Sequence, residues 1–346
     1  MIQYEQIKEV HLELSTNCNA SCPLCPRNFY GYPHNGGYPI TELSLADVQH
    51  ILSPEFLQQL KIVQINGNLG DFILARDALA IVKYFRESNP LLRIDISTNA
   101  GARPDDFWRE LAQYKPVVRF CIDGLEDTHS LYRRDTQFQT VIKHARAYID
   151  AGGHAIWKMI KFDHNQHQIS ECRALSWQLG FAQFDSVDHG RNNGPVFDRE
   201  GKHIYSIGDT MHYHDPATLI DWRKQSIQKQ EHYNHTVHEK ITCDTITKKT
   251  IYISAAGDVY PCCYLGFFPR TYGSDLYHGN DQIKHLLNGV ENNAKEKPLR
   301  ECIEWFNSVE ESWKADSFES GKLWRCNHHC GSSPRLAQAQ IPQPSS

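Results

Sequence analysis

The sequence predicts an α/β protein: a partial (β/α)₆ barrel over residues 1–190, followed by a smaller C-terminal domain. Short runs that alternate apolar and polar side chains recur through the first half of the chain, and stretches with helical apolar spacing separate them. Strands that alternate with helices of this length form βαβ units and a parallel sheet. Six such units by about residue 190 fit a partial barrel better than a closed eight-fold one.

The strands and helices of the barrel follow from this spacing. The first strand spans residues 7–14 and ends at Ser15 and Thr16, so the cysteine-rich segment after it lies on a loop. Ser44 is the expected N-cap of the first helix. The other strands are expected at residues 61–66, 92–97, 117–122, 155–162 and 182–187, and the helices at 44–60, 74–87, 105–114, 138–151 and 166–179. Binding residues are expected where the parallel strands end.

The second half of the chain breaks the alternation. Residues 191–242 are polar and His-rich and are predicted to bridge two domains, with a helix around 217–232. The smaller domain is expected over residues 243–335 and a frayed tail over 336–346. Inside that domain the pattern predicts a small hairpin at 250–254 and 258–260 and helices at 282–290 and 299–316.

The composition is that of an ordinary globular protein, with 346 residues, 40% of them apolar and 22% charged. A chain of this length buries a core without disulfides. The net charge of −5 offers no basic footprint for nucleic acid. No run of 18 apolar residues and no signal peptide are present, which predicts a cytoplasmic protein that does not span a membrane.

Cysteines are the unusual feature of this composition, because eleven are many for a cytosolic chain. In a reducing compartment, clustered cysteines indicate metal binding or catalysis more often than disulfides. They form two groups at opposite ends of the chain, with single residues between: Cys18, Cys22 and Cys25; Cys121 and Cys172; and Cys243, Cys262, Cys263, Cys302, Cys326 and Cys330.

The first group places three thiolates within eight residues on one loop: Cys18, Cys22 and Cys25. Thiolates are soft, anionic ligands that suit iron–sulfur clusters. Three protein ligands leave one iron of a [4Fe–4S] cube open, as a catalytic cluster requires. Two other interpretations stay open at this point: a zinc site completed by His11 or His34, and three unrelated core cysteines.

The CxxxCxxC loop after the first strand of a repeating β/α pattern resembles that of the radical S-adenosylmethionine (SAM) superfamily. The resemblance covers roughly residues 7–190 in strand order. It implies that SAM chelates the open iron through its amino and carboxylate groups. It also implies that reductive cleavage of SAM yields a 5′-deoxyadenosyl radical, which abstracts a hydrogen atom from the substrate, while the protein supplies position and excludes water.

Further segments resemble the SAM-contacting motifs of that superfamily. Gly67-Asn68-Leu69-Gly70-Asp71 lies where related enzymes have Gly-Gly-Glu, which implies that Gly67, Gly70 and Asp71 approach the SAM amino group. On its own, a Gly-rich segment after a strand is more often only a turn. Asp71 departs from the family's glutamate, and the segment is longer.

Two later motifs extend the resemblance. Ser97-Thr98-Asn99 resembles a recurring Thr-Asn-Gly, and the run from Asp123 to Arg133 resembles a segment found after the fourth strand. The resemblance implies that Ser97, Asn99 and Asp123 face SAM or substrate and that Arg133, or the adjacent Arg134, pairs with the SAM carboxylate. The alternative is that Asp123 caps a turn and the arginines are solvated.

The C-terminal cysteines resemble the opening of SPASM and twitch auxiliary-cluster domains in the spacing of Cys243, Gly257 and Cys262. Four thiolates saturate one cube, so the resemblance implies a second [4Fe–4S] cluster. Its expected ligands are Cys243, Cys262, Cys326 and Cys330, with Cys263 and Cys302 as spares. A zinc ribbon is the alternative, because two paired cysteine elements suit tetrahedral zinc equally well.

Other residues carry weaker expectations. Cys121 and Cys172 are predicted to be core residues. His328 and His329 lie between the last two expected ligands and are placed to hydrogen-bond to one or to replace it. Lys158 faces the barrel interior by strand alternation, although a lone lysine more often extends its charge toward solvent.

Taken together, the sequence predicts a radical SAM enzyme of oxidoreductase type with two [4Fe–4S] clusters. Its expected partners are a flavodoxin or ferredoxin as electron donor and a small molecule or short peptide as substrate. A small molecule is favoured slightly because the first strand begins by about residue 7, which leaves no room for a preceding peptide-binding module. The alternative is a non-catalytic zinc-binding interaction protein.

Overall fold

The computed structural model describes residues 1–28, 30–31, 39–188, 194–208, 237, 240–266 and 278–331, with the backbone alone for residues 278–280. His34, the expected helix at 217–232 and the expected tail at 336–346 lie outside the described residues. The boundaries drawn between the barrel, the bridge and the C-terminal domain stay a prediction.

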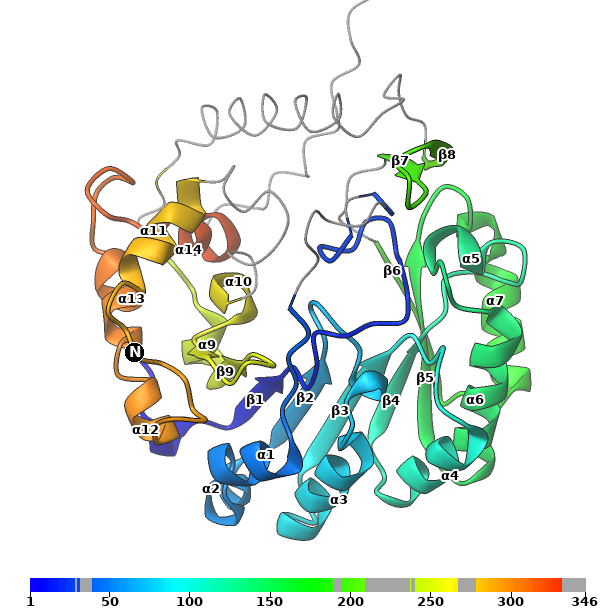
Figure 1. Ribbon diagram of the computed structural model, residues 1–346, viewed down its shortest axis with the longest axis horizontal. Helices are drawn as coiled ribbons and strands as arrows, with labels where there is room; N and C mark the ends of the chain where they lie inside the picture. The colour runs from blue at the N-terminus through cyan, green and yellow to red at the C-terminus, as the bar shows by residue number, and fades with distance from the viewer. Residues whose placement is uncertain are drawn as a thin grey trace, which may run out of the picture.

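A largely parallel sheet organises the molecule, which confirms the predicted α/β class and partial barrel (Figure 1). Its eight strands run in the order β10-β9-β1-β2-β3-β4-β5-β6, and β1 to β6 pair in parallel with their neighbours. The strands are β1 (Glu9–Leu12), β2 (Ile62–Asn66), β3 (Arg93–Thr98), β4 (Val117–Cys121), β5 (His154–Lys161), β6 (Gln183–Asp188), β9 (Thr250–Ile253) and β10 (Val259–Tyr260).

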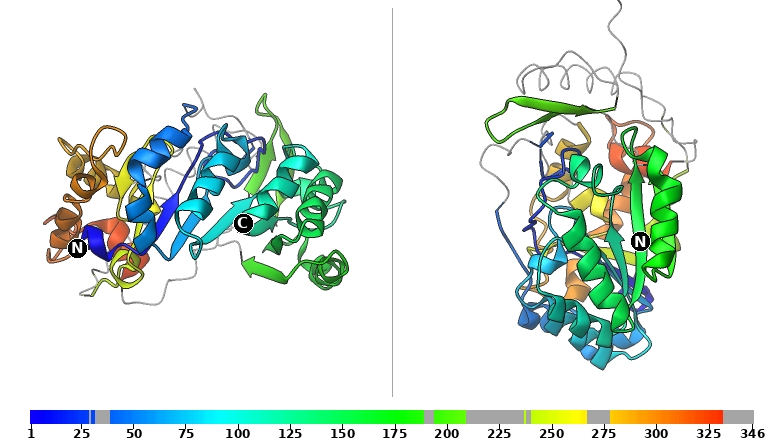
Figure 2. Two further views of the ribbon diagram at one scale, coloured as in Figure 1. Left: turned by 90° about the horizontal axis from the view of Figure 1, so that it is seen from below. Right: turned by 90° about the vertical axis from the view of Figure 1, so that its right-hand side faces the viewer.

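Helices pack on the outer face of this curved sheet (Figures 1 and 2). The side chains of β5 show how the two faces differ: Trp157 and Met159 are fully buried in the core beneath the helices, whereas Lys158 on the opposite face is half-buried. The helices of the barrel are α1 (Leu45–Ile51), α2 (Pro54–Gln59), α3 (Ala78–Ser88), α4 (Asp105–Gln113), α5 (His129–Tyr132), α6 (Phe138–Asp150) and α7 (Ile169–Gln178).

Two expected barrel helices differ from the structure. The single helix at 44–60 is two helices, because Ser53 caps α2 through the Phe56 amide and Pro54 occupies its first turn. The helix expected from residue 74 begins at Ala78, because Phe72–Leu74 form a 3₁₀ turn that the Asp71 side chain caps.

The C-terminal elements include helices that the sequence placed only in part. These are α9 (Asp244–Thr247), α10 (Cys263–Gly266), α11 (His278–Leu286), α12 (Leu299–Cys302), α13 (Phe306–Ser312) and α14 (Trp324–Cys330). The single helix expected at 299–316 was wrong, since turns separate α12 from α13 while apolar side chains on both stay buried. Helix α14 was not expected from the sequence.

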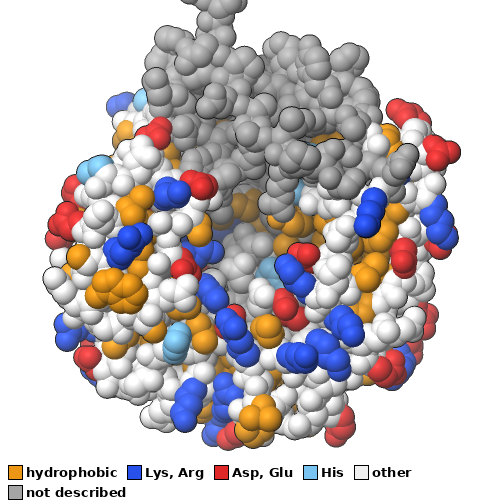
Figure 3. Space-filling model, turned by 180° about the vertical axis from the view of Figure 1, so that it is seen from behind, with side chains coloured by type: hydrophobic (Ala, Val, Ile, Leu, Met, Phe, Trp, Pro, Cys, Tyr) orange, Lys and Arg blue, Asp and Glu red, His pale blue; other side chains and the backbone are white. Residues whose placement is uncertain are grey.

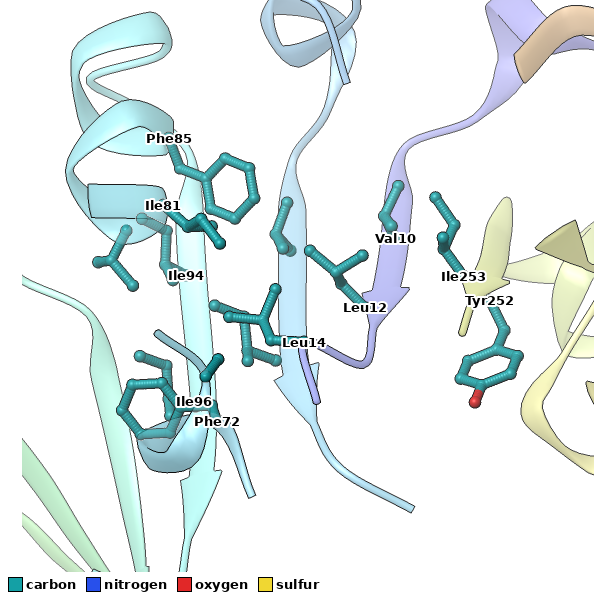
Figure 4. Packing of buried hydrophobic residues seen from close by; sticks show 14 of the residues in the cluster. Val10, Leu12, Leu14, Phe72, Ile81, Phe85, Ile94, Ile96, Tyr252 and Ile253 are labelled. Atoms are coloured by element: carbon teal, nitrogen blue, oxygen red, sulfur yellow. The ribbon is translucent and has the colours of Figure 1, made fainter. Parts of the chain in front are cut away.

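The C-terminal hairpin joins the barrel sheet directly. Strand β9 pairs in parallel with β1 and antiparallel with β10, and Leu12 of β1 is the register partner of Ile253 of β9 (Figure 4). Across the same layer, Leu12 and Leu14 lie near Ile96, and the apolar core continues from there into the C-terminal helices. One core therefore holds the N-terminal strand between the barrel and the C-terminal elements.

A second, smaller hairpin lies within the stretch predicted as an unpatterned bridge. Its antiparallel strands are β7 (Gly194–Phe197) and β8 (His203–Ile207). Val196 and Ile207 pack against Cys22 in a small apolar cluster. No helix in the described part of the chain is both long and apolar enough to cross a membrane.

Candidate functional site

The loop that carries Cys18, Cys22 and Cys25 follows β1 at the carboxyl edge of the sheet. A turn closes between the last two cysteines, where the Cys25 amide donates to the Cys22 carbonyl at 3.2 Å. The Ser21 amide donates to the Arg134 carbonyl at 3.0 Å and ties the loop to the segment after α5. Cys22 is buried and the other two cysteines are half-buried, so the loop presents its thiols at the mouth of the barrel.

Polar groups from two neighbouring strand ends surround these thiols. The Asn99 amide group lies 3.6 Å from the Cys18 sulfur, and the Ala20 backbone amide donates to the same sulfur at 3.4 Å. The Arg133 guanidinium lies 3.8 Å from the Cys22 sulfur. Burial raises the pKa of Cys18, so a thiolate there requires the positive charge that bound metal supplies.

Arg133 is held in place by a buried ion pair. Its Nε atom lies 2.6 Å from a carboxylate oxygen of Asp123, which is fully buried. The other Asp123 oxygen accepts from the Ile160 amide of β5 at 2.6 Å. The structure therefore places Asp123 as the group that orients Arg133 toward Cys22. The turn-cap alternative for Asp123 and the solvated alternative for Arg133 both fit these contacts poorly.

Asp71 lies under the same loop, with its carboxylate fully engaged. It accepts from the Thr98 hydroxyl at 2.8 Å and from the Asn99 backbone amide at 2.7 Å. Burial raises the pKa of Asp71 to about 6. Because Asn99 in turn contacts Cys18, Asp71 fixes the end of β3 against the cysteine loop.

Gly67 and Gly70 are required by close backbone approach. A Cβ atom on Gly70 would lie 1.9 Å from the Ser15 carbonyl oxygen, and one on Gly67 would lie 1.9 Å from the Gly70 carbonyl oxygen. The Asp71 amide also donates to the Asn17 carbonyl at 2.8 Å. The Gly-rich segment thus packs directly on the chain that leads to Cys18. Ser97, the remaining predicted residue, is half-buried on the interior face of β3.

The C-terminal cysteines come together from three elements. Cys243 precedes α9, Cys262 follows β10, and Cys326 and Cys330 lie one turn apart on α14. The Thr242 amide donates to the Cys330 carbonyl at 2.8 Å, which brings the two ends of this region side by side. A hydrogen bond from the Cys330 thiol lowers the pKa of Cys243, although burial opposes this.

The same four thiols influence one another electrostatically. The pKa of Cys330 is raised by its hydrogen bond to Cys243, by burial, and by the charges of Cys243, Cys326 and Cys262. The pKa of Cys262 is raised by burial and by the charges of Cys263, Cys326 and Cys243. Such mutual effects require that the four sulfurs share one small volume.

Of the two expected spares, Cys302 lies apart from this group, whereas the charge of the adjacent Cys263 acts on Cys262. The Cys302 thiol is buried in α12 and lies 3.8 Å from the Lys297 carbonyl oxygen, to which it donates. Burial raises the pKa of the Cys263 thiol, and the charge of Glu13, which follows β1, raises it further. Neither is placed beside Cys330.

Zinc and an iron–sulfur cluster make different demands on the positions of cysteine sulfurs. Among the described residues, no three Cys, His, Asp or Glu side chains converge on a single point as the ligands of one metal ion do. Tetrahedral zinc would hold every sulfur at about 2.3 Å from one centre. In a [4Fe–4S] cube each thiolate binds a different iron, so the sulfurs stay further apart.

Three histidines near the cysteine groups were expected as possible ligands: His11 for zinc, and His328 and His329 as replacements for an auxiliary ligand. His11 hydrogen-bonds through Nε2 to the Asn66 carbonyl at 2.7 Å, and burial lowers its pKa. His328 stacks on Trp324 with ring centroids 4.6 Å apart, and His329 stacks on Tyr264 at 4.0 Å. His11 is thus held by a backbone carbonyl, and His328 and His329 by neighbouring aromatic rings.

One residue not singled out from the sequence connects the two cysteine regions. Glu13, buried at the end of β1, accepts from the Leu69 and Gly70 amides at 2.6 and 3.3 Å. Its other oxygen accepts from the Tyr252 hydroxyl of β9 at 2.7 Å. The only signal in the sequence is an acidic residue in an otherwise apolar strand end, which by itself predicts nothing about its partners.

The fold is similar over most of the chain to that of solved proteins with bound S-adenosylmethionine. No protein-family model and no curated protein matches the chain. Among solved structures, the chain is similar to Streptococcus suis SuiB bound to the precursor peptide SuiA, with a TM-score of 0.56 and 15% identity over 92% of this chain and 70% of SuiB. The SuiB structure bound to S-adenosylmethionine gives a TM-score of 0.52 and 14% identity, with 90% of this chain and 66% of SuiB covered.

A second similar structure is native anSMEcpe with bound AdoMet. Its TM-score is 0.53 with 14% identity, over 94% of this chain and 92% of anSMEcpe. At these identities the likeness establishes the fold, and the chain spans about two thirds of the length of SuiB.

Proposed function

We propose that this protein is a radical SAM enzyme that binds a [4Fe–4S] cluster through Cys18, Cys22 and Cys25. The observation that carries the proposal is the set of three thiols on the loop after β1, with Asn99 and Arg133 beside their sulfurs. When bound, the reduced cluster and SAM supply a 5′-deoxyadenosyl radical that abstracts a hydrogen atom from the substrate.

The chain's own residues hold this site and shape its charge. Arg133 places a cation beside Cys22 and is itself held by Asp123. Asp71 keeps Asn99 against Cys18 through the Asn99 amide. These contacts favour deprotonated cysteines and a fixed loop, which a site-differentiated cluster requires.

The SAM-contacting set is part of the same proposal: Gly67, Gly70, Asp71, Ser97, Asn99, Asp123 and Arg133. The contacts of Asp71 and Asp123 support a refinement of their roles. Both carboxylates are occupied by protein donors, so each acts by positioning a neighbour, Asn99 or Arg133. Arg133 is the residue best placed to meet a carboxylate of SAM.

An auxiliary [4Fe–4S] cluster on Cys243, Cys262, Cys326 and Cys330 completes the proposal. The mutual electrostatic effects of the four thiols and the position of Cys302 away from them support this ligand set. A cluster there would accept an electron from a substrate radical or anchor the substrate. An external donor such as a flavodoxin or ferredoxin would reduce the first cluster.

The substrate is proposed to be a small molecule or a peptide. The structure of SuiB holds its precursor peptide, which supports the peptide alternative. The sequence alone slightly favoured a small molecule. Both classes belong in the first substrate screen.

Anaerobic reconstitution with iron and sulfide tests the proposal. We expect broad absorbance at about 400 nm and roughly eight irons per chain. We also expect 5′-deoxyadenosine to be released from SAM only when a reductant is present. A colourless protein that instead binds two zinc ions and leaves SAM intact would support a non-catalytic zinc-binding interaction protein.

A further inference from the structure

Lys158 of β5 lies on the interior face of the barrel. Its neighbours Trp157 and Met159 are fully buried in the core beneath the helices, so alternation turns Lys158 to the other side. Ile160, two residues further along the same face, packs in the apolar cluster that contains Cys22. Residues two apart on a strand lie about 7 Å from each other, so Lys158 stands one layer beneath the cysteine loop.

The surroundings of Lys158 place its charge near the proposed reaction site. Cys121 of β4 is its register partner, and both Arg133 and Lys158 lower the pKa of the Cys121 thiol against the effect of burial. Lys158 is half-buried rather than enclosed. Seen from behind, the surface of the described residues is hollowed near its centre and carries charged side chains at the edge of the hollow (Figure 3).

Other cations on this face are neutralised by nearby carboxylates. Arg119 lies 3.3 Å from Asp95, and Arg133 lies 2.6 Å from Asp123. Lys158, in contrast, forms no ion pair or hydrogen bond through its ammonium group with any described residue. Asp185 is its register partner on β6, yet the two side chains are not ion-paired.

An ammonium group that is partly withdrawn from water and unpaired is costly, and a bound anion removes that cost. We propose that Lys158 binds an oxyanion of the substrate, a carboxylate or a phosphate, and so holds the substrate beneath the cysteine loop. This inference rests on the proposed function, because it assigns a substrate group to that site. Lys158 thereby selects anionic substrates over neutral ones.

Ligand-observed saturation-transfer NMR on the reconstituted full-length protein with SAM tests this, with acetate as the probe and acetamide as its neutral counterpart. We expect saturation transfer to acetate in the wild type and in Lys158→Arg, and roughly tenfold weaker acetate binding in Lys158→Met and Lys158→Gln. Lys161→Met is the matched control, because Lys161 lies at the end of the same strand and pairs with Asp188 at 2.7 Å.

Equal binding of acetate by wild type and both neutral variants would overturn the inference, as would equal binding of acetamide and acetate by the wild type. Competition with inorganic phosphate distinguishes a carboxylate from a phosphate ligand. If phosphate displaces acetate when its concentration is lower than that of acetate, the site prefers a phosphate group. If displacement needs more phosphate than acetate, the site prefers a carboxylate. Thermal melting confirms that each variant is folded. Release of 5′-deoxyadenosine by the wild type is measured separately, so a failure of the proposed function is not confused with a failure of Lys158.

Discussion

Cys18, Cys22 and Cys25 share one loop but have different neighbours. Asn99 contacts the first and Arg133 contacts the second. Replacing any one of them with Ala removes one of three protein ligands, so we expect 5′-deoxyadenosine formation to fall to background. The measurement is chromatography of SAM cleavage products after reduction. Cys172→Ala, on α7, serves as control and should retain cleavage.

His129 is a buried, neutral imidazole whose titration is expected to change stability with pH. Its Nδ1 atom accepts from the Asp123 amide at 3.2 Å, and Nε2 donates to the Thr136 hydroxyl at 3.0 Å. Burial lowers the pKa of His129 to about 4 from 6.5, so the unfolded chain binds a proton first as pH falls. The neutral His129 side chain therefore contributes about 3 kcal/mol to the free energy of unfolding. This contribution is fully present above pH ~6.5 and is lost as the pH falls to ~4.

The variant His129→Asn tests this, because it keeps an acceptor for the Asp123 amide and removes the titrating group. As the pH is lowered across this range, the melting temperature of the variant should fall less steeply than that of the wild type. Exposed His50→Asn provides the baseline. If the melting temperatures of His129→Asn and the wild type fell in parallel with pH, the assignment of a neutral His129 would be contradicted.

At the scale of elements, the Gly-rich segment after β2 depends on contact with the chain that leads to Cys18. In Gly70→Ala the new Cβ would lie 1.9 Å from the Ser15 carbonyl oxygen. We expect a loss of at least about 2 kcal/mol in unfolding free energy and weaker cluster retention, because the backbone must shift. Denaturant unfolding and iron content measure both effects.

Gly152→Ala is the matched control for Gly70→Ala. Gly152 has a φ of +85°, and apart from its chain neighbours no atom of the described residues lies within 4 Å of the position that a Cβ would take, so only backbone strain of about 1 kcal/mol is expected. Normal iron content in Gly70→Ala would show that the segment tolerates displacement.

The bond between Glu13 and Tyr252 joins β1, the Gly-rich segment and β9 through one carboxylate. Tyr252→Phe leaves one buried Glu13 oxygen without its donor, and we expect a cost of about 1–3 kcal/mol. Hydrogen exchange at the Leu69 and Gly70 amides, which Glu13 also binds, should quicken. Tyr84→Phe removes a half-buried hydroxyl bonded to the Leu52 carbonyl and should cost less. If Tyr252→Phe and Tyr84→Phe destabilised the protein equally, the role of Glu13 in joining β1, the Gly-rich segment and β9 would be contradicted.

At the scale of the whole molecule, the two cysteine sites draw on opposite ends of the chain. A triple variant that lacks Cys18, Cys22 and Cys25 is therefore expected to retain about four irons. Cys326→Ala or Cys330→Ala should lower iron content and destabilise the C-terminal elements, because cluster binding free energy is also folding free energy. Iron analysis and thermal melting are the measurements.

The controls for the C-terminal site are Cys263→Ala and Cys302→Ala, which are expected to retain iron near the wild-type content. Cys302 bonds to the Lys297 carbonyl, away from the other thiols. If Cys302→Ala lost iron and Cys326→Ala retained it, Cys302 rather than Cys326 would be the fourth ligand of the C-terminal cluster.

Local periodicity let the sequence predict the strands and most helices of the barrel. Strand alternation and helical spacing are properties of neighbouring residues, so β1 to β6 could be placed from them. The same reasoning failed where an apolar pattern runs through a break, as at Pro54 between α1 and α2. It also missed β7 and β8, whose residues find their apolar partners on the cysteine loop rather than nearby in sequence.

The sequence by itself determined the alternating fold class and the spacing of both cysteine groups, because each depends on residues close together in the chain. Only the tertiary structure decided that β9 pairs with β1, that Tyr252 binds Glu13 across 239 residues, and that Cys330 lies beside Cys243. Such contacts depend on which faces of distant elements fit and bury one another, and no local pattern records that choice. For the same reason Lys158 could be placed on the barrel interior from the sequence, but its lack of a partner among the described residues could not.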